Sequence, residues 1–268
     1  MHKACFLLLI LSSFVWMTAC QKPSDEITRI NKENFTIEEQ QQIGAFFKAK
    51  IEADYMQYPR LNADVFTDAH NYLNSLLKTL LVSSNIERRS ELDWNVSIIR
   101  NDSESNAFIL PGGELYLYTG LLKYLNSEHE LMSIIAHEIA YADTDDAINR
   151  LKAEYGGVLL GDILLENEIS DVEQIIANLP RLVLPTSEVM EADVYSVNLL
   201  CDYAWDARGL KSVFERVDSV GTHLEWLDSR QGDLQLRINT IENAALPCGL
   251  EGRTFDERYV KFKNEWLP

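Results

Sequence analysis

The stretch EHELMSIIAHEIAYAD, residues 128–143, decides how this sequence is interpreted. It places His137 and Glu138 side by side within a run of mostly apolar and small residues. Tyr141 follows the histidine by four positions. The first two residues begin the pattern His-Glu-x-x-His, and the third interrupts it at the position where a second histidine belongs.

The full pattern works because residues four apart on a helix are offset by only about 40° around its axis. Two imidazoles then face one metal ion, and the glutamate next to the first activates a metal-bound water. With Tyr141 in the last position, the sequence indicates either a zinc site that has changed its ligands or a zinc-site fold without its metal. A His-Glu pair alone does not decide between them.

The flanking sequence predicts a small sheet and a helix around this pair. Ser127 and Glu130 have the spacing of a capping box, which predicts the start of the helix that carries His137. Upstream, WNVSII at 94–99 alternates like a strand. Two short apolar runs then flank Pro111-Gly112-Gly113, which predicts a hairpin.

The rest of the chain has mostly helical patterns. Thr36 and Glu39 form a capping box ahead of one helix, and a second is expected at about 62–82. After Asp146 the sequence is almost wholly helical, with helices at about 187–203 and 233–244 among those expected. No repeat or interdomain linker is evident, so we expect one α+β domain, mostly helical, with one small sheet.

The composition excludes one class of partner. The 268 residues carry a formal net charge of −18. A surface this acidic repels phosphate backbones, which makes nucleic acid an improbable partner.

The first residues predict targeting to the bacterial envelope. Residues 1–19 have a charged start and an apolar run too short to span a membrane comfortably. The sequence MTAC, which ends at Cys20, resembles a lipobox, in which the cysteine carries lipid. We therefore expect a lipoprotein signal at 1–19, a lipidated tether at 20–35 and a peptidase-like domain at 36–268. The lipid is the only expected membrane contact, and Gln21 after the cysteine suggests the outer membrane.

Cys201 and Cys248 remain after this segment is set aside. In an oxidising compartment they are either bonded to each other or buried as two thiols, and the sequence leaves both alternatives open. A bond would stabilise the fold by roughly 4 kcal/mol in the chain-entropy model.

Four segments occur in an order that resembles metallopeptidase family forty-eight, the HtpX-like and LoiP-like envelope zinc metallopeptidases of the gluzincin type. They are NAFILPGGELYLYTGLL at 106–122, residues 128–143, EADVYSVNLL at 191–200 and WDARGL at 205–210. The resemblance covers about residues 60–245 and implies a gluzincin-like fold. It also implies an exposed hairpin edge on which an extended peptide pairs as an added strand.

The resemblance assigns roles position by position. His137 matches the first zinc ligand, Glu138 the catalytic general base, and Asp193 the second-shell aspartate that orients a metal-bound histidine. The second and third ligand positions are substituted by Tyr141 and Val189.

A further family histidine has no counterpart here. Its position falls on Gln231, or on Arg230 if the alignment shifts by one residue. Together with the two substituted ligand positions, this leaves the family's zinc motif degenerate.

Loss of two ligands is expected to weaken metal binding severely. A four-ligand zinc site contributes roughly 10–16 kcal/mol, or about 3 kcal/mol per ligand, so two missing ligands correspond to about a 10⁴-fold loss of affinity. Glu188 and Glu191 flank Val189 but lie about 100–200° away around the helix, and a one-residue shift or a bulge would be needed to bring Glu188 inward as a metal ligand with His137. Asp145, two turns after His137 on the same face, is a further candidate.

Three hypotheses follow for the function. The chain is a catalytically impaired family member that binds extended protein segments, an active zinc-dependent endopeptidase of envelope quality control with a rebuilt site, or an interaction module whose groove has closed. Zinc is the cofactor expected of the active form, and none is expected of the others. Tyr141 packed over His137 in a filled cleft would mark the third hypothesis.

Overall fold

The structure is a computed structural model, and it describes residues 28–221, 223–228, 230, 232–249 and 252–268. The predicted signal at 1–19, the lipidation residue Cys20, and Gln231 lie outside the described residues. Within the described part of the chain, no helix is both long enough and apolar enough to cross a bilayer.

The predicted strand and hairpin form one three-stranded sheet in the order β1-β3-β2. β3 (Glu114–Tyr118) lies in the centre, parallel to β1 (Asn95–Ile99) and antiparallel to β2 (Ala107–Ile109). The turn between β2 and β3 uses Gly112 and Gly113 at φ 91° and 98°, a backbone conformation that residues with a Cβ rarely adopt.

Helices account for most of the remaining chain, which confirms the α+β, mostly helical prediction. The α-helices are α1 (Ile37–Ala53), α2 (Thr67–Leu80), α3 (Thr119–Tyr124), α4 (Glu128–Asp143), α5 (Asp146–Leu164), α6 (Val172–Asn178), α7 (Thr186–Leu200), α8 (Gly209–Val220), α9 (Glu225–Asp228), α10 (Leu234–Ala245) and α11 (Asp256–Lys261). Three short helical turns complete the list: η1 (Leu179–Arg181), η2 (Leu246–Cys248) and η3 (Phe262–Trp266).

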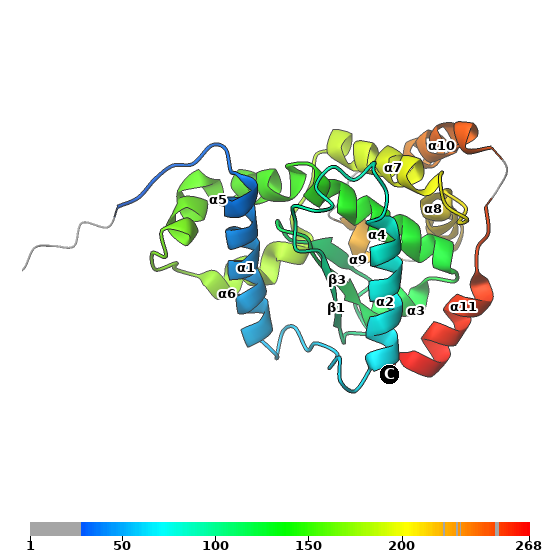
Figure 1. Ribbon diagram of the computed structural model, residues 1–268, viewed down its shortest axis with the longest axis horizontal. Coiled ribbons are helices and arrows are strands. Elements are labelled where there is room, and N and C mark those ends of the chain that lie inside the picture. The colour runs from blue at the N-terminus through cyan, green and yellow to red at the C-terminus, as the bar shows by residue number, and fades with distance from the viewer. Residues whose placement is uncertain (1–27, 222, 229, 231, 250–251) are drawn as a thin grey trace, which may run out of the picture.

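Helix α4 is the centre of the fold. All of its residues are buried, and it contacts β2, α5, α7 and α8. In Figure 1 it runs between the strands and α7. A helix enclosed on every side has no solvent face, so its polar side chains have to find partners inside the protein.

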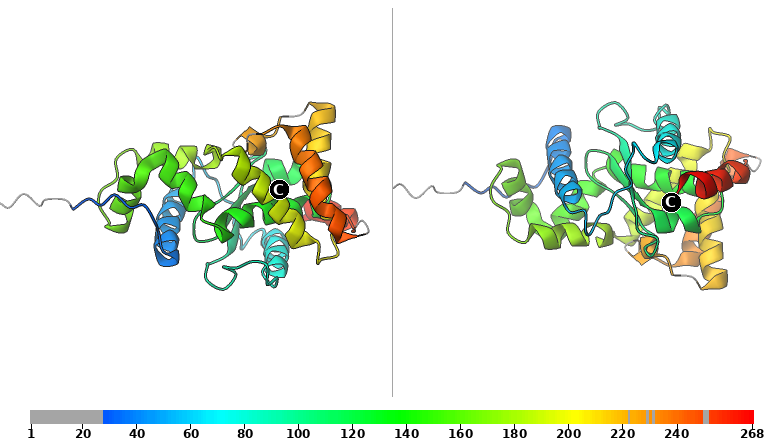
Figure 2. Two further views of the ribbon diagram at one scale, coloured as in Figure 1. Left: turned by 90° about the horizontal axis from the view of Figure 1, so that it is seen from above. Right: turned by 90° about the horizontal axis from the view of Figure 1, so that it is seen from below.

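Two hydrophobic clusters lie on either side of the sheet. The larger cluster joins α2, α4, α7, α8 and the C-terminal helices, and the smaller one lies beneath α1, α5 and α6. Figure 2 shows α1, α5 and α6 at one end of an elongated molecule, with α8, α10 and α11 at the other. Both clusters include side chains of the sheet, which joins them into one body.

The two predicted capping boxes have different outcomes. The box at Thr36 and Glu39 is present at the start of α1. The box at Ser127 is wrong, because the Ser127 side chain makes no cap bond and its Oγ lies 2.6 Å from Nδ1 of His129. Glu130 accepts from the Asn126 main-chain N–H at 2.8 Å and pairs with Arg216 of α8. The buried helix start is thus satisfied by residues beside it and by one arginine of the helix packed against it.

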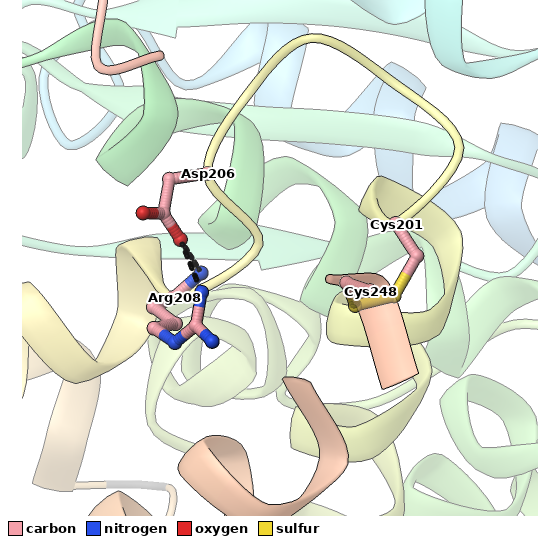
Figure 3. Close-up of a disulfide and its surroundings, with 4 residues drawn as sticks. All are labelled: Cys201, Asp206, Arg208 and Cys248. Atoms are coloured by element: carbon pink, nitrogen blue, oxygen red, sulfur yellow. Dashed lines mark hydrogen bonds and ion pairs between the residues drawn. A yellow bond between two sulfur atoms is a disulfide. The ribbon is translucent and has the colours of Figure 1, made fainter. Parts of the chain in front are cut away.

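A disulfide joins Cys201, at the end of α7, to Cys248 in η2, and it settles the alternative that the sequence left open (Figure 3). The two Cα atoms lie 4.9 Å apart, and the bond links positions 47 residues apart. The loop between them contains the turn in which Asp206 accepts a bond from the Arg208 main-chain N–H at 2.9 Å. The bond therefore ties the end of α7 to the end of α10.

Candidate active site

His137 is fully buried on α4, with a neighbour at each ring nitrogen. Nε2 lies 2.8 Å from the hydroxyl of Tyr141, one turn further along the helix. Nδ1 lies 3.1 Å from Oδ1 of Asp193, within ion-pair distance but outside hydrogen-bonding geometry. Burial lowers the pKa of His137, and Asp193 opposes that effect. A neutral imidazole with its proton on Nδ1 fits both neighbours and leaves Nε2 to accept from Tyr141.

Asp193 lies on α7 and is held by Arg237 of α10. The guanidinium donates two bonds, Nε to Oδ2 at 2.7 Å and Nη2 to Oδ1 at 2.8 Å. Burial by itself would raise the pKa of this carboxyl, but Arg237 and His137 together hold the pKa of Asp193 below its usual value. The predicted second-shell aspartate is thus beside His137, and Arg237 is a partner that the sequence did not indicate.

Glu138 points into the same buried region and is held by the segment after α8. Trp226 of α9 donates its indole N–H to Oε1 at 2.8 Å, and Arg230 forms an ion pair with the same oxygen. Oε2 has no hydrogen-bond partner among the described residues. The predicted general base is therefore fixed by donors from the chain itself.

The Arg230 guanidinium contacts the catalytic helix and the sheet at once. Besides Glu138 it donates from Nη2 to the carbonyl of Ala107 in β2 at 3.3 Å and from Nη1 to the carbonyl of Trp226 at 3.0 Å. Its own carbonyl accepts a bond of 3.2 Å from Arg237. The residue is only 2% exposed, so this side chain is part of the core.

The expected exposed edge of the hairpin is covered. β2 is an edge strand, as predicted, but Ala107, Phe108 and Ile109 are all buried. The carbonyl of Ile109 accepts a bond of 3.1 Å from Arg150 of α5, and that of Ala107 accepts from Arg230. The acceptors that an added peptide strand would use are thus bonded to two arginines of the same chain.

The donor atoms decide whether these residues fit a zinc ion. Val189 is fully buried and has no atom that can bind a metal. Tyr141 would have to lose its proton, and burial raises its pKa, although Arg230 acts in the other direction. The Nε2 of His137 is already hydrogen-bonded to the Tyr141 hydroxyl. This arrangement does not fit a zinc ion.

Glu188 does not change this conclusion. Burial, Asp146 and Glu191 raise its pKa, and Arg150 acts in the other direction. Within the part of the chain that the structure describes, no three His, Cys, Asp or Glu side chains converge as metal ligands do. The assignment of Glu188 as a metal ligand stays a prediction.

The geometry of the site defines a class of protein. A buried helix with a His-Glu pair crosses beside the edge strand of a small sheet, and a later helix supplies an aspartate to the histidine. This is the architecture of a metallopeptidase domain, although its donor atoms do not suit the metal. The chain matches the model of Peptidase family M48 over residues 68–229, and it belongs to this family.

Several curated proteins are similar to this chain. The mitochondrial metalloendopeptidase OMA1 of Schizosaccharomyces pombe is 29% identical over 153 residues, which cover 55% of this chain and 44% of that protein. OMA1 of Arabidopsis thaliana is 27% identical over 164 residues, 58% of this chain and 33% of that protein. The beta-barrel assembly-enhancing protease of Escherichia coli is 29% identical over 106 residues, 40% of this chain and 20% of that protein. The chain thus matches less than half the length of each.

Proposed function

We propose that this chain is a catalytically impaired member of Peptidase family M48 that is held in the bacterial envelope by lipid on Cys20 and binds extended segments of other proteins. One observation carries the impaired part of this proposal. Both groups that metal-dependent hydrolysis needs free, the His137 Nε2 and the Glu138 carboxylate, are bonded to side chains of the chain itself.

The chemistry follows from these bonds. A general base of this type needs a metal-polarised water, and Glu138 instead accepts from an indole and a guanidinium in a site closed to solvent. Tyr141 donates to the histidine nitrogen that would bind the metal. The residues present can hold each other, but they cannot position and activate a water.

The binding part of the proposal is supported by the sheet and by the relatives. Extended segments pair with strand edges through main-chain hydrogen bonds, and such an edge needs no metal. Tyr141 packs edge-on against the buried His137 ring, which is the arrangement expected of an interaction module with a closed groove. Binding at β2 therefore requires Arg150 and Arg230 to release the carbonyls of Ile109 and Ala107. A related protein is named for beta-barrel assembly, which supports unfolded envelope proteins as the class of partner.

The alternative, an active zinc endopeptidase with a rebuilt site, is favoured by family membership and by the retention of His137, Glu138 and Asp193. It requires Glu188 or another oxygen donor to reach His137.

Metal content separates the two functions. The full chain is expressed with its own leader, purified without chelators, and its zinc is quantified by mass spectrometry before and after incubation with zinc and desalting. We expect far less than one zinc per chain and no chelator-sensitive cleavage of an unfolded protein. Stoichiometric zinc that disappears in His137→Ala, together with cleavage that stops on chelation, would establish the active enzyme.

Segment binding has its own test. An unfolded envelope protein is offered to the full chain and to Arg150→Gln, which frees the Ile109 carbonyl without touching Glu138. We expect tighter binding by the variant. Arg181→Gln, a largely exposed arginine on η1, is the control that should bind as the wild type does. Equal binding by all three proteins would remove β2 as the binding edge.

A further inference from the structure

We propose that the guanidinium of Arg230 takes the electrostatic place of a metal ion in this site, and that it excludes divalent cations even when the missing ligands are restored. The inference rests on the proposed function in one respect, since it assumes that the native protein binds no zinc. It goes further because it assigns the exclusion to one side chain and not only to absent ligands.

The first argument is the balance of buried charge. Two carboxylates, Glu138 and Asp193, lie in the site with two guanidinium groups, Arg230 and Arg237. Arg150 of α5 is also buried and interacts electrostatically with Glu138 and Arg230, so the buried guanidinium groups already outnumber the carboxylates. A divalent cation added to this set would be an uncompensated double charge in a closed interior, which is among the most unfavourable changes that a protein core can undergo.

The second argument is position. Arg230 pairs with the carboxylate that would face a metal-bound water, and the guanidinium carbon lies 5.8 Å from the centre of the Tyr141 ring. It also binds the Ala107 carbonyl on the strand edge. A cation placed between Glu138 and the sheet therefore occupies the space in which metal and water would have to be held.

The third argument is that the side chain is fixed. The guanidinium bonds to the Trp226 carbonyl four residues before it and lies 4.8 Å from the Trp226 ring centre. Arg237, which is itself fixed by Asp193, bonds the Arg230 carbonyl. Removing Arg230 from the site would break contacts to two helices and one strand, so zinc cannot displace it without a large rearrangement.

The test restores the ligands first and removes the arginine second. Tyr141→His with Val189→Glu recreates the three-ligand set that the family pattern assigns to these positions, and the triple variant adds Arg230→Gln. Binding of zinc alone is measured by calorimetry, and cobalt spectra report tetrahedral coordination. We expect the triple variant to bind zinc at least about tenfold more tightly than the double variant, because a like charge no longer faces the ion.

Two further variants make the result specific. Arg181→Gln in the double variant removes an arginine on η1 that is largely exposed and pairs with Glu104, and it should leave zinc affinity unchanged. Arg230→Lys in the double variant keeps the charge and should keep zinc out. This comparison stands even if Arg230→Gln does not fold, since tight zinc binding by the lysine variant would overturn the proposal.

The possible failures are distinguishable. Stoichiometric zinc in the native chain would overturn both the proposed function and this inference. A metal-free native chain whose double variant binds zinc as tightly as the triple variant would leave the proposed function intact and overturn the role of Arg230 alone.

Discussion

Tyr141 stands where the family pattern has a histidine, so an O–H group takes the place of a ring nitrogen that could bind a metal. A histidine there would offer a second nitrogen able to bind a metal, whereas the hydroxyl of a protonated tyrosine serves as a hydrogen-bond donor. The tyrosine hydroxyl instead satisfies His137 from within α4, at 2.8 Å. The retained histidine is therefore consistent with a site without zinc, because its two ring nitrogens have found neighbours in Tyr141 and Asp193.

The Tyr141 hydroxyl should therefore be important for stability. Tyr141→Phe leaves the Nε2 of His137 buried without a donor, and we expect a loss of about 1–3 kcal/mol of unfolding free energy in urea titrations. Tyr116→Phe is the matched control, since the Tyr116 hydroxyl is buried with no hydrogen-bond partner among the described residues. Its removal breaks no hydrogen bond and takes an unpaired hydroxyl out of the core, so stability should stay the same or rise. Equal effects of the two variants would show that the Tyr141 bond contributes nothing.

A buried histidine outside the site gives a pH prediction. Burial lowers the pKa of His129, against the opposing charges of Glu130, Asp206 and Asp256. Below about pH 6.5 His129 becomes protonated in the unfolded chain but stays neutral in the folded chain. The free energy of unfolding therefore falls as the pH falls, by up to about 1.4 kcal/mol per pH unit. The loss ends at the folded-state pKa of His129.

His129→Gln isolates this contribution, because glutamine does not titrate and His137 remains in both proteins. We expect the difference in unfolding free energy between wild type and variant to shrink as the pH falls from 7 to 5. A difference that stays constant over that range would contradict the assignment of His129 as neutral in the folded state.

Sequence reasoning identified the residues that lie beside one another in the site, but not their charge partners. His137, Glu138, Tyr141 and Asp193 could be named because the family motif contains their positions. The sequence indicated Arg230 only as one of two positions at which a further family histidine is absent. Its role depends on a three-dimensional contact with Glu138, 92 residues earlier, and no local pattern encodes such a contact.

At the scale of elements, sequence patterns predicted the helices and turns whose conformation depends mainly on their own residues. The hairpin followed from Pro111-Gly112-Gly113, and α1 from its capping box. The exposure of β2 was wrong because the arginines that cover it come from α5 and from the segment after α9. Residues from distant parts of the chain cover a strand edge, and the sequence of the strand itself does not reveal which residues these are.

The disulfide is expected to act on two elements together. It closes a 47-residue separation between the ends of α7 and α10, the helices that carry Asp193 and Arg237. Replacing both cysteines by serine should reduce the unfolding free energy by roughly 4 kcal/mol in the chain-entropy model. Dithiothreitol should destabilise the wild type by a similar amount and leave the double variant unchanged. A reductant effect on the variant would point to a cause other than this bond.

The proposed metal-free site predicts that the stability of the whole molecule does not depend on a metal. A site filled at one hundred times its dissociation constant would add about 2.7 kcal/mol. We expect neither EDTA nor added zinc to shift the melting temperature of the full chain by more than about 1 °C. The metal-binding triple variant provides the positive control, and a chelator-induced drop in the wild type would contradict a metal-free fold.

The long separation between Glu138 and its partners also has a consequence for biosynthesis. Helix α4 is synthesised before Trp226 and Arg230, which lie 88 and 92 residues after Glu138. Until they arrive, closing the core around α4 would bury a carboxylate with no counter-charge. Vectorial folding must therefore pause with this helix incompletely enclosed, and the last quarter of the chain completes the core. A chain that ends before Trp226 would leave the apolar helix α4 incompletely covered and therefore exposed to chaperones.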